Sequence, residues 1–225
     1  MKKMYFYPKW LRFWHWTNAI LFIILIFTGI SMHYSAQSNL FIPFDIAMVS
    51  HNVAGILLTL LYIFYAIMNA ASGNYKHYIP KIKGLTRKML IQARYYLYGV
   101  FAGEPHPYEI SEENKFNPLQ KITYFSIMFL FVPVICISGI LLMFPEFAPE
   151  DIAGMGGVWP MAVLHAVVGY ILSVFMFGHI YLATHGETVT SNFKSMFTGY
   201  HIEHEEHEEE HDMEEELIKD MENKE

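Results

Sequence analysis

Four long apolar runs dominate the pattern of hydrophobic and polar positions along this chain. They occupy residues 13–32, 53–71, 122–145 and 158–184, and none of these windows contains Lys, Arg, Asp or Glu. A membrane-spanning helix needs about 20 apolar residues, and a charge at its centre costs roughly 2.5–3.5 kcal/mol. The pattern therefore predicts four transmembrane helices rather than a soluble bundle whose helices are apolar on all sides.

The helix boundaries follow from the prolines and polar residues around these runs. Pro118 stands where the third helix begins, a position at which its missing N–H costs little. Pro133 falls inside that helix and predicts a local distortion. The first run is too long for the apolar region of a signal peptide, so we expect it to remain as a membrane helix. The chain is thus expected to be an all-α, integral membrane four-helix bundle with helices at 11–33, 48–72, 119–144 and 159–185.

Lysine and arginine are distributed unevenly over the connections, and this predicts the orientation of the chain. The short connections 34–47 and 145–158 contain neither residue. The cations lie instead at the N-terminus and in the long segment 73–118, as Lys2, Lys3, Lys9, Arg12, Lys76, Lys81, Lys83, Arg87, Lys88, Arg94 and Lys115. By the positive-inside rule, both termini and the long segment are expected in the cytoplasm of a bacterium, with the protein in the inner membrane.

The polar segments add a surface helix and a tail. Residues 81–101 mix basic side chains with Leu and Tyr, which predicts a cytoplasmic helix lying among lipid headgroups. Residues 201–225 alternate His and Glu and hold 13 of the 22 acidic residues. We expect a membrane domain, 1–200, followed by this acidic tail, 201–225, in a disordered or helical state. The basic residues adjoin membrane segments, and their pattern indicates no nucleic-acid partner.

Of the twelve histidines, His15, His51, His165 and His179 stand out in the predicted membrane helices, where ionisable residues face the protein interior and mark function. His165 and His179 are 14 residues apart in the fourth helix. At 3.6 residues per turn they share a face to within roughly 40°, and they are separated by about 21 Å along the axis. One helix can therefore present two imidazoles to two cofactors stacked across the membrane. His185 falls on the far side of the helix and fails this test.

Depth in the membrane pairs these histidines with two others. The fourth helix is expected to run inward, so His165 lies near the outer face and His179 near the inner face. His51, at the outer start of the second helix, matches His165, and His15, at the inner start of the first, matches His179. His33 could replace His51, although a position at the membrane interface is favoured. The sequence predicts two bis-histidine sites, His51/His165 and His15/His179.

Two axial imidazoles are typical of a haem that carries electrons, because no coordination position is left for oxygen or substrate. The one cysteine, Cys136, allows neither a C-x-x-C metal site nor covalent haem attachment, so two haem b groups are expected. Arg12 is placed to neutralise a propionate of the inner haem. Glycines near the ligands are expected either to let a porphyrin lie against the backbone or to allow tight helix packing; they are Gly29, Gly55, Gly139, Gly169 and Gly178.

Motifs in three of the helices carry a family resemblance. They are Arg12-Phe-Trp-His15-Trp16 with Thr28-Gly29, Lys115-Phe-Asn-Pro-Leu-Gln-Lys121 with Ser138-Gly139, and His179-Ile-Tyr-Leu-Ala-Thr184 after His165. Their order and spacing resemble the di-haem cytochrome b subunits of bacterial formate dehydrogenases and nickel–iron hydrogenases over nearly all of residues 9–200. The resemblance is greatest to the formate dehydrogenase gamma subunit.

The resemblance implies an electron path and partners. In that family, a periplasmic catalytic subunit passes electrons through an iron–sulfur subunit to the outer haem, and the inner haem reduces a quinone, here expected to be menaquinone. The quinone pocket lies beside the inner ligand, here His179, and the start of the third helix, here Asn117 and Gln120. Capping of the third helix is the alternative role for those two side chains.

Three functional hypotheses remain open on the sequence alone. In the first, the chain is the electron-transferring, quinone-reducing subunit of a formate dehydrogenase and is not catalytic by itself. In the second, it anchors a nickel–iron hydrogenase, or a thiosulfate reductase in which electrons flow outward. In the third, it is a haem-free anchor or transporter whose histidines bind metals or protons.

Overall fold

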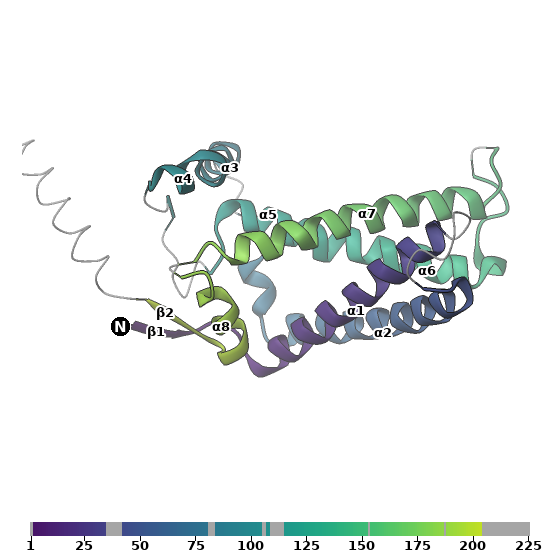
Figure 1. Cartoon of the computed structure of the whole chain (residues 1–225), viewed down its shortest axis with the longest axis horizontal. Coiled ribbons are helices and arrows are strands. Elements are labelled where there is room, and N and C mark those ends of the chain that lie inside the picture. The colour runs from purple at the N-terminus through teal and green to yellow at the C-terminus, as the bar shows by residue number, and fades with distance from the viewer. Residues whose placement is uncertain are drawn as a thin grey trace, which may run out of the picture. The chain divides into compact units, whose positions relative to one another are not determined.

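The structure, a computed structural model, divides into two compact units (Figure 1). The larger unit spans Phe13–Ile180, and the smaller one joins the two ends of the chain, Met1–Arg12 and Tyr181–Glu225. The described residues are 2–34, 42–80, 84–104, 107–108, 115–152, 154–186 and 188–203.

Within the described part of the chain, four helices are long and apolar enough to cross a membrane, as the hydrophobic pattern predicts. They are α1 (Lys9–His33), α2 (Phe44–Ala71), a third span (Pro118–Met143) and α7 (Val158–Ala183). The second helix begins four residues earlier than expected. Pro43 precedes it with a φ of −52°, close to the helical value, and Asp45 places a negative charge in its first turn, where the helix dipole favours one.

The third span contains a wide turn ahead of its proline. It consists of α5 (Pro118–Ser126), the π-helical turn η4 (Ile127–Phe131) and α6 (Val132–Met143). The N–H of Val132 bonds to the carbonyl of Ile127, and Pro133 has no N–H to donate. The carbonyl of Met128 therefore receives no hydrogen bond from either residue. The distortion predicted at Pro133 takes the form of this π turn.

Side chains join the four spans within the larger unit. Trp14 of α1 packs on Tyr65 of α2, with 4.3 Å between ring centroids. The hydroxyl of Tyr62 on α2 donates to the free carbonyl of Met128 on the third span, at 3.0 Å. Figure 1 shows α1 running beside α2, and α7 running beside α5 and α6. Histidine contacts described below join α7 to each of the other three spans.

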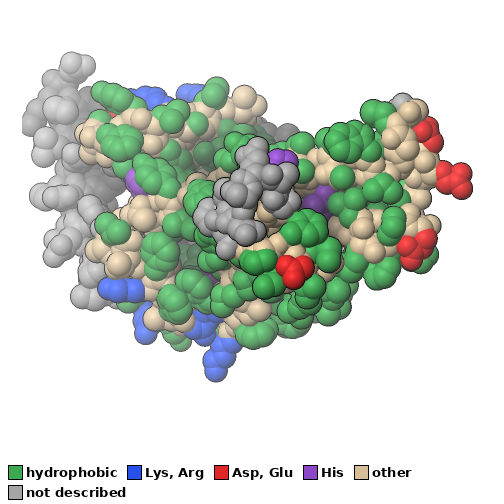
Figure 2. Space-filling view, turned by 45° about the vertical axis from the view of Figure 1, so that its right-hand side comes forward, with side chains coloured by type: hydrophobic (Ala, Val, Ile, Leu, Met, Phe, Trp, Pro, Cys, Tyr) green, Lys and Arg blue, Asp and Glu red, His purple; other side chains and the backbone are tan. Residues whose placement is uncertain are grey.

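Large apolar side chains point outward from the helices. Phe13, Leu60, Tyr170 and Phe177 are each more than half exposed. Figure 2 shows hydrophobic side chains across the visible face of the helices. Soluble proteins rarely expose contiguous apolar patches of more than a few hundred Å², so a surface of this kind indicates lipid contact and a multi-pass membrane protein.

The segment between the second and third spans is helical, as the basic and apolar pattern of residues 81–101 predicts. It contains α3 (Leu85–Arg94), the π turn η3 (Tyr95–Gly99) and α4 (Val100–Ala102), preceded by η2 (Asn74–His77). α3 packs against α5. Leu90, Leu97 and Phe101 are strongly exposed, and Arg94 forms an ion pair with Glu104 at 2.7 Å. The position of this helical segment on a membrane surface stays a prediction.

The smaller unit contains a pair of strands that the sequence analysis missed. β1 (Lys2–Tyr5) pairs antiparallel with β2 (Tyr200–Glu203), with Tyr5 opposite Tyr200. The helix α8 (Ser191–Thr198) leads into β2 through Gly199, whose φ of +89° suits a residue without Cβ. β2 runs across the predicted boundary between residues 200 and 201, and the rest of the His/Glu tail lies outside the described residues.

Replacing Tyr62 with Phe should destabilise the bundle, because the Met128 carbonyl would lose its donor inside the membrane. We expect a loss of about 1 kcal/mol, the usual size of a hydrogen bond between membrane helices, observed as a lower Tm of the purified protein in detergent. Tyr170→Phe is the matched control, since Tyr170 is exposed on α7. Equal Tm values for the two variants would contradict this role of Tyr62.

Candidate functional site

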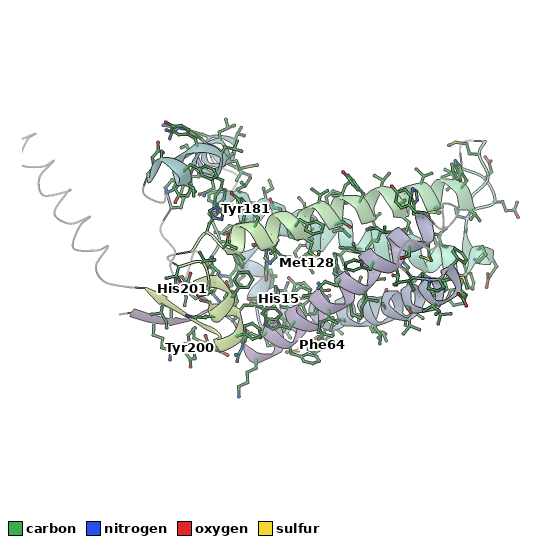
Figure 3. All side chains as sticks on the ribbon, viewed as in Figure 1. His15, Phe64, Met128, Tyr181, Tyr200 and His201 are labelled. Carbon is green, nitrogen blue, oxygen red and sulfur yellow. The ribbon has the colours of Figure 1, made fainter. Side chains whose placement is uncertain are left out.

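Four histidine rings form two close pairs inside the larger unit. His51 on α2 and His165 on α7 have ring centroids 6.2 Å apart, and His15 on α1 and His179 on α7 have centroids 6.0 Å apart. In Figure 3 the labelled His15 lies between α1 and α7. The fold thus brings together both predicted pairs, and α7 contributes one member to each.

These separations fit one iron between the rings of each pair. A ligating imidazole nitrogen lies about 2 Å from its metal, and the ring centroid lies about 1 Å further away, so two imidazoles on opposite sides of one iron have centroids about 6 Å apart. Among the described residues, no group of three or more His, Cys, Asp or Glu side chains is arranged to bind a metal ion. The donors present therefore suit two bis-histidine haems better than a zinc site.

Each histidine of the His51/His165 pair is held by a hydroxyl on a neighbouring helix. Thr28 Oγ1 on α1 lies 3.0 Å from Nδ1 of His51, and Ser138 Oγ on α6 lies 3.0 Å from Nδ1 of His165. Each hydroxyl also donates to the backbone carbonyl four residues earlier in its own helix, at 2.7 Å for Thr28 and 2.8 Å for Ser138. The same contact between a hydroxyl and a histidine therefore occurs twice, once between α1 and α2 and once between α6 and α7.

This arrangement determines which ring nitrogen carries the proton. A hydroxyl has a single proton, and here that proton is directed to a backbone carbonyl, so the oxygen accepts from the ring. We assign Nδ1 as the protonated nitrogen of His51 and His165, which leaves the Nε2 lone pair free to bind iron. Partners of this kind fix the orientation of a metal-ligating imidazole and raise its basicity.

The residue after each hydroxyl is a glycine that lets the imidazole approach the helix. A Cβ atom on Gly29 or Gly139 would lie 3.4 Å or 3.1 Å from Cε1 of the facing histidine. Of the two roles predicted for these glycines, tight packing is the one that the structure shows, and it is packing against a candidate ligand. A Cβ on Gly55 or Gly178 would meet nothing within 4 Å, so these two glycines are not needed for close packing, and their role beside a porphyrin stays a prediction.

The His15/His179 pair has a more aromatic setting. Phe175 stacks on the ring of His179, with centroids 5.8 Å apart and 22° between the planes. The hydroxyl of Tyr124 on α5 lies 3.5 Å from Nδ1 of His179, at the limit of a hydrogen bond. Nδ1 of His15 is buried and has no hydrogen-bond partner among the described residues. The imidazoles of this pair are thus held less firmly by polar groups than those of His51 and His165.

The two predicted quinone residues cap α5. Oδ1 of Asn117 accepts from the N–H of Gln120 at 2.9 Å, and Oε1 of Gln120 accepts from the N–H of Asn117 at 3.1 Å. This reciprocal pair is a capping box. The capping role is confirmed, and the quinone role stays a prediction. The amide NH₂ of Gln120 takes no part in the box.

Two further polar residues beside this cap were not found from the sequence. Nδ2 of Asn117 donates to the hydroxyl of Tyr96 at 2.7 Å. Burial raises the pKa of the Tyr96 phenol, so it stays protonated at neutral pH and keeps a proton to donate. Gln92 on α3 is fully buried, and its side chain interacts with the Tyr96 phenol. A polar cluster of Gln92, Tyr96, Asn117 and Gln120 therefore lies where α3 packs on α5.

The other residues that the sequence singled out make contacts of other kinds. The guanidinium of Arg12 donates to the backbone carbonyl of Phe197 in the smaller unit, and its propionate role stays a prediction. His33 is exposed at the end of α1, as the favoured interfacial position requires. His185 Nδ1 lies 3.0 Å from the carbonyl of Tyr181. His106 and the histidines after residue 203 lie outside the described residues.

Comparison with known families gives a match that extends over the whole membrane domain. A sequence model of the prokaryotic cytochrome b561 family matches residues 6–199. This chain belongs to the prokaryotic cytochrome b561 family. It is a multi-pass membrane cytochrome of the haem b-binding type, which makes the histidine pairs the natural candidates for its haem ligands.

Two relatives of this b561-family protein come from Escherichia coli (strain K12). The putative cytochrome YdhU is 34% identical over 200 residues, which are 89% of this chain and 75% of the relative. The cytochrome b556(Fdn) subunit of the nitrate-inducible formate dehydrogenase is 27% identical over 188 residues, 82% of this chain and 78% of the relative. The resemblance to formate dehydrogenase cytochrome subunits is therefore confirmed.

Replacing Gly139 with Ala should reduce haem binding, because the new Cβ would lie 3.1 Å from Cε1 of His165. Alanine favours a helix by about 1 kcal/mol over glycine, so a loss would come from the contact and not from the helix. We expect a lower haem-to-protein ratio in the purified protein, with a smaller loss for Gly29→Ala. Cys136→Ala on the same helix is the control. Full haem content in Gly139→Ala would contradict this packing role.

Proposed function

We propose that this cytochrome holds two haem b groups, at His51/His165 and His15/His179, and passes electrons through them between a periplasmic oxidoreductase and the quinone pool. The observation that carries the proposal is the pair of ring separations, 6.2 Å and 6.0 Å, each suited to one iron between two imidazoles. The two histidines of α7 lie about 21 Å apart along the helix axis. A row of two redox sites can thus extend through most of a bilayer.

His51 and His165 would hold one haem and His15 and His179 the other, and each haem, when bound, would supply an iron that exchanges one electron. The residues of the chain orient the rings and keep the site apolar. Thr28 and Ser138 contact Nδ1 of His51 and His165, which leaves both Nε2 atoms available to iron, and Phe175 stacks on the ring of His179. These contacts support electron transfer and give no position for catalysis at the iron.

The proposed direction is inward. With both termini in the cytoplasm, electrons enter at the His51/His165 site near the periplasm of the inner membrane and reach the His15/His179 site near the cytoplasm. Moving one charge against 100 mV costs about 2.3 kcal/mol, so this transfer conserves energy when the final acceptor takes its protons from the cytoplasm. The cation-free short connections and the cationic long segment support this orientation.

A formate dehydrogenase is the partner that the comparisons favour. One relative is a formate dehydrogenase cytochrome subunit, and it is matched over 82% of this chain. We propose that an iron–sulfur subunit of such an enzyme docks on the periplasmic side and delivers electrons from a catalytic subunit.

The proposed quinone site uses the polar cluster at the start of α5. The NH₂ of Gln120 and the phenol of Tyr96 are neutral donors that suit a quinone carbonyl, and α5 also carries Tyr124, which contacts His179. Menaquinone is the proposed acceptor. Neutral donors are appropriate because they bind a quinone carbonyl without placing an unpaired charge beside the membrane.

Replacing His179 with Ala should remove one haem and quinone reduction together, because the second site would lose an axial ligand. The measurement is the haem-to-protein ratio, expected to fall from two to one, together with electron transfer to a menaquinone analogue in membrane vesicles. His185→Ala is the matched control on the same stretch of chain and should keep both haems. Two haems in His179→Ala would show that the pairing is wrong.

Replacing Gln120 with Glu separates quinone binding from capping. The carboxylate can still accept from the N–H of Asn117 and keep the box, but it has no NH₂ to donate. Loss of one hydrogen bond, about 0.5–1.5 kcal/mol, predicts a KM for quinone raised roughly 2- to 10-fold with two haems retained. A Tm of Gln120→Glu equal to that of the wild-type protein would show that the cap is kept, because a Glu side chain at this position can complete a capping box. An unchanged KM in Gln120→Glu would leave Gln120 as a cap only.

A further inference from the structure

We infer that Thr28 and Ser138 make the His51/His165 site the lower-potential haem site of the two, so that electrons pass downhill from it to the His15/His179 site. The inference rests on the proposed function and adds a direction that is built into the ligand contacts. Its basis is an asymmetry: both imidazoles of the first pair share Nδ1 with a hydroxyl at 3.0 Å, whereas those of the second pair do not.

The hydroxyls act on iron through the imidazole ring. A hydrogen bond accepted from Nδ1–H increases the negative charge on the ring and makes Nε2 a stronger donor to the metal. A stronger donor stabilises the ferric ion more than the ferrous ion, because the ferric ion carries more positive charge, and the reduction potential falls. Thr28 and Ser138 each donate their own proton to a backbone carbonyl, at 2.7 Å and 2.8 Å, which polarises the hydroxyl and strengthens the bond it accepts.

The second pair lacks this effect. Nδ1 of His15 is buried without an acceptor among the described residues, and Tyr124 lies 3.5 Å from Nδ1 of His179, too far for a strong bond. The phenol is also a poorer acceptor than an aliphatic hydroxyl, because its oxygen lone pair is delocalised into the ring. The His15 and His179 imidazoles therefore donate less strongly to iron, and the reduced state is favoured at their site.

The electron balance of the step is simple. One electron leaves the His51/His165 site for each electron that arrives at the His15/His179 site, and the Nδ1 protons stay on their rings throughout. Thr28 and Ser138 are positioning residues that act through His51 and His165. They fit close to the rings because a glycine follows each of them.

The test is a redox titration of the full chain in membrane vesicles, followed through the reduced-minus-oxidised spectrum. The wild-type protein should titrate in two one-electron components. Ser138→Ala and Thr28→Val should each raise the lower component and leave the higher one unchanged. A tenfold shift in the oxidised-to-reduced equilibrium corresponds to about 59 mV for one electron, and we expect a shift of up to that size for each variant.

Two matched controls remove hydroxyls that do not hold a histidine. Ser173 on α7 donates to the carbonyl of Gly169 at 2.7 Å, and Thr59 on α2 donates to that of Gly55 at 2.9 Å. Neither hydroxyl bonds a histidine among the described residues. Ser173→Ala and Thr59→Val should leave both components in place. Ser138→Thr keeps a hydroxyl at this position, so its lower component should have the wild-type potential, unlike that of Ser138→Ala.

Three results would overturn the inference: neither test variant shifts a component, the two variants shift different components, or both shift the higher one. If Ser138→Ala or Thr28→Val loses haem, Ser138→Cys is used as the test variant instead. A thiol is a weaker acceptor of similar size, so this variant should raise the potential of the lower component. A single component in a wild-type protein that holds two haems per chain would also overturn the inference, whereas fewer than two haems per chain would contradict the proposed function, so the haem-to-protein ratio separates the two failures.

Discussion

An imidazole that binds iron with Nε2 carries a proton on Nδ1, and this N–H needs a hydrogen-bond acceptor. Inside a lipid bilayer no bulk water is available as that acceptor. The His51/His165 site meets this constraint with a hydroxyl from a neighbouring helix, and a glycine after the hydroxyl gives the ring room to approach. The same two-residue arrangement, Thr28-Gly29 on α1 and Ser138-Gly139 on α6, contacts both candidate ligands. Helix packing, ring orientation and tautomer are thereby set together.

The four spans are organised around α7. It supplies His165 to one pair and His179 to the other, so its position relative to α1, α2 and the third span determines both sites. The third span holds His165 through Ser138 and contacts His179 through Tyr124. The π turn and Pro133 lie between these two contacts, where Tyr62 supplies the hydrogen bond that the proline cannot. Along the third span, the hydrogen bond from Tyr62 thus lies between the two contacts with histidines.

The membrane helices and the histidine pairs could be predicted because each depends on a local signal. Charge-free windows define the spans, and the spacing of His165 and His179 follows from helix geometry alone. The hydroxyl partners could not be assigned in this way, since they depend on how α1 meets α2 and how α6 meets α7. Their signal was present as a repeated hydroxyl–glycine dipeptide, which the sequence analysis noted only as part of a resemblance.

Other features depended on contacts between distant residues. The strands β1 and β2 are four residues each and pair across almost the whole chain, so neither has a recognisable pattern on its own. Gln92 and Tyr96 lie in a segment predicted only as a surface helix, and their burial follows from the packing of α3 on α5. Asn117 and Gln120 show the opposite case, because the spacing of a capping box is visible in the sequence.

The central claim is that two imidazole pairs each hold one haem b within a single chain. The most direct measurement is the haem-to-protein ratio of the purified full chain, read with its reduced-minus-oxidised spectrum. The account predicts two haem b groups per chain, with a b-type alpha band. A colourless protein, or a single haem per fully loaded chain, would contradict it.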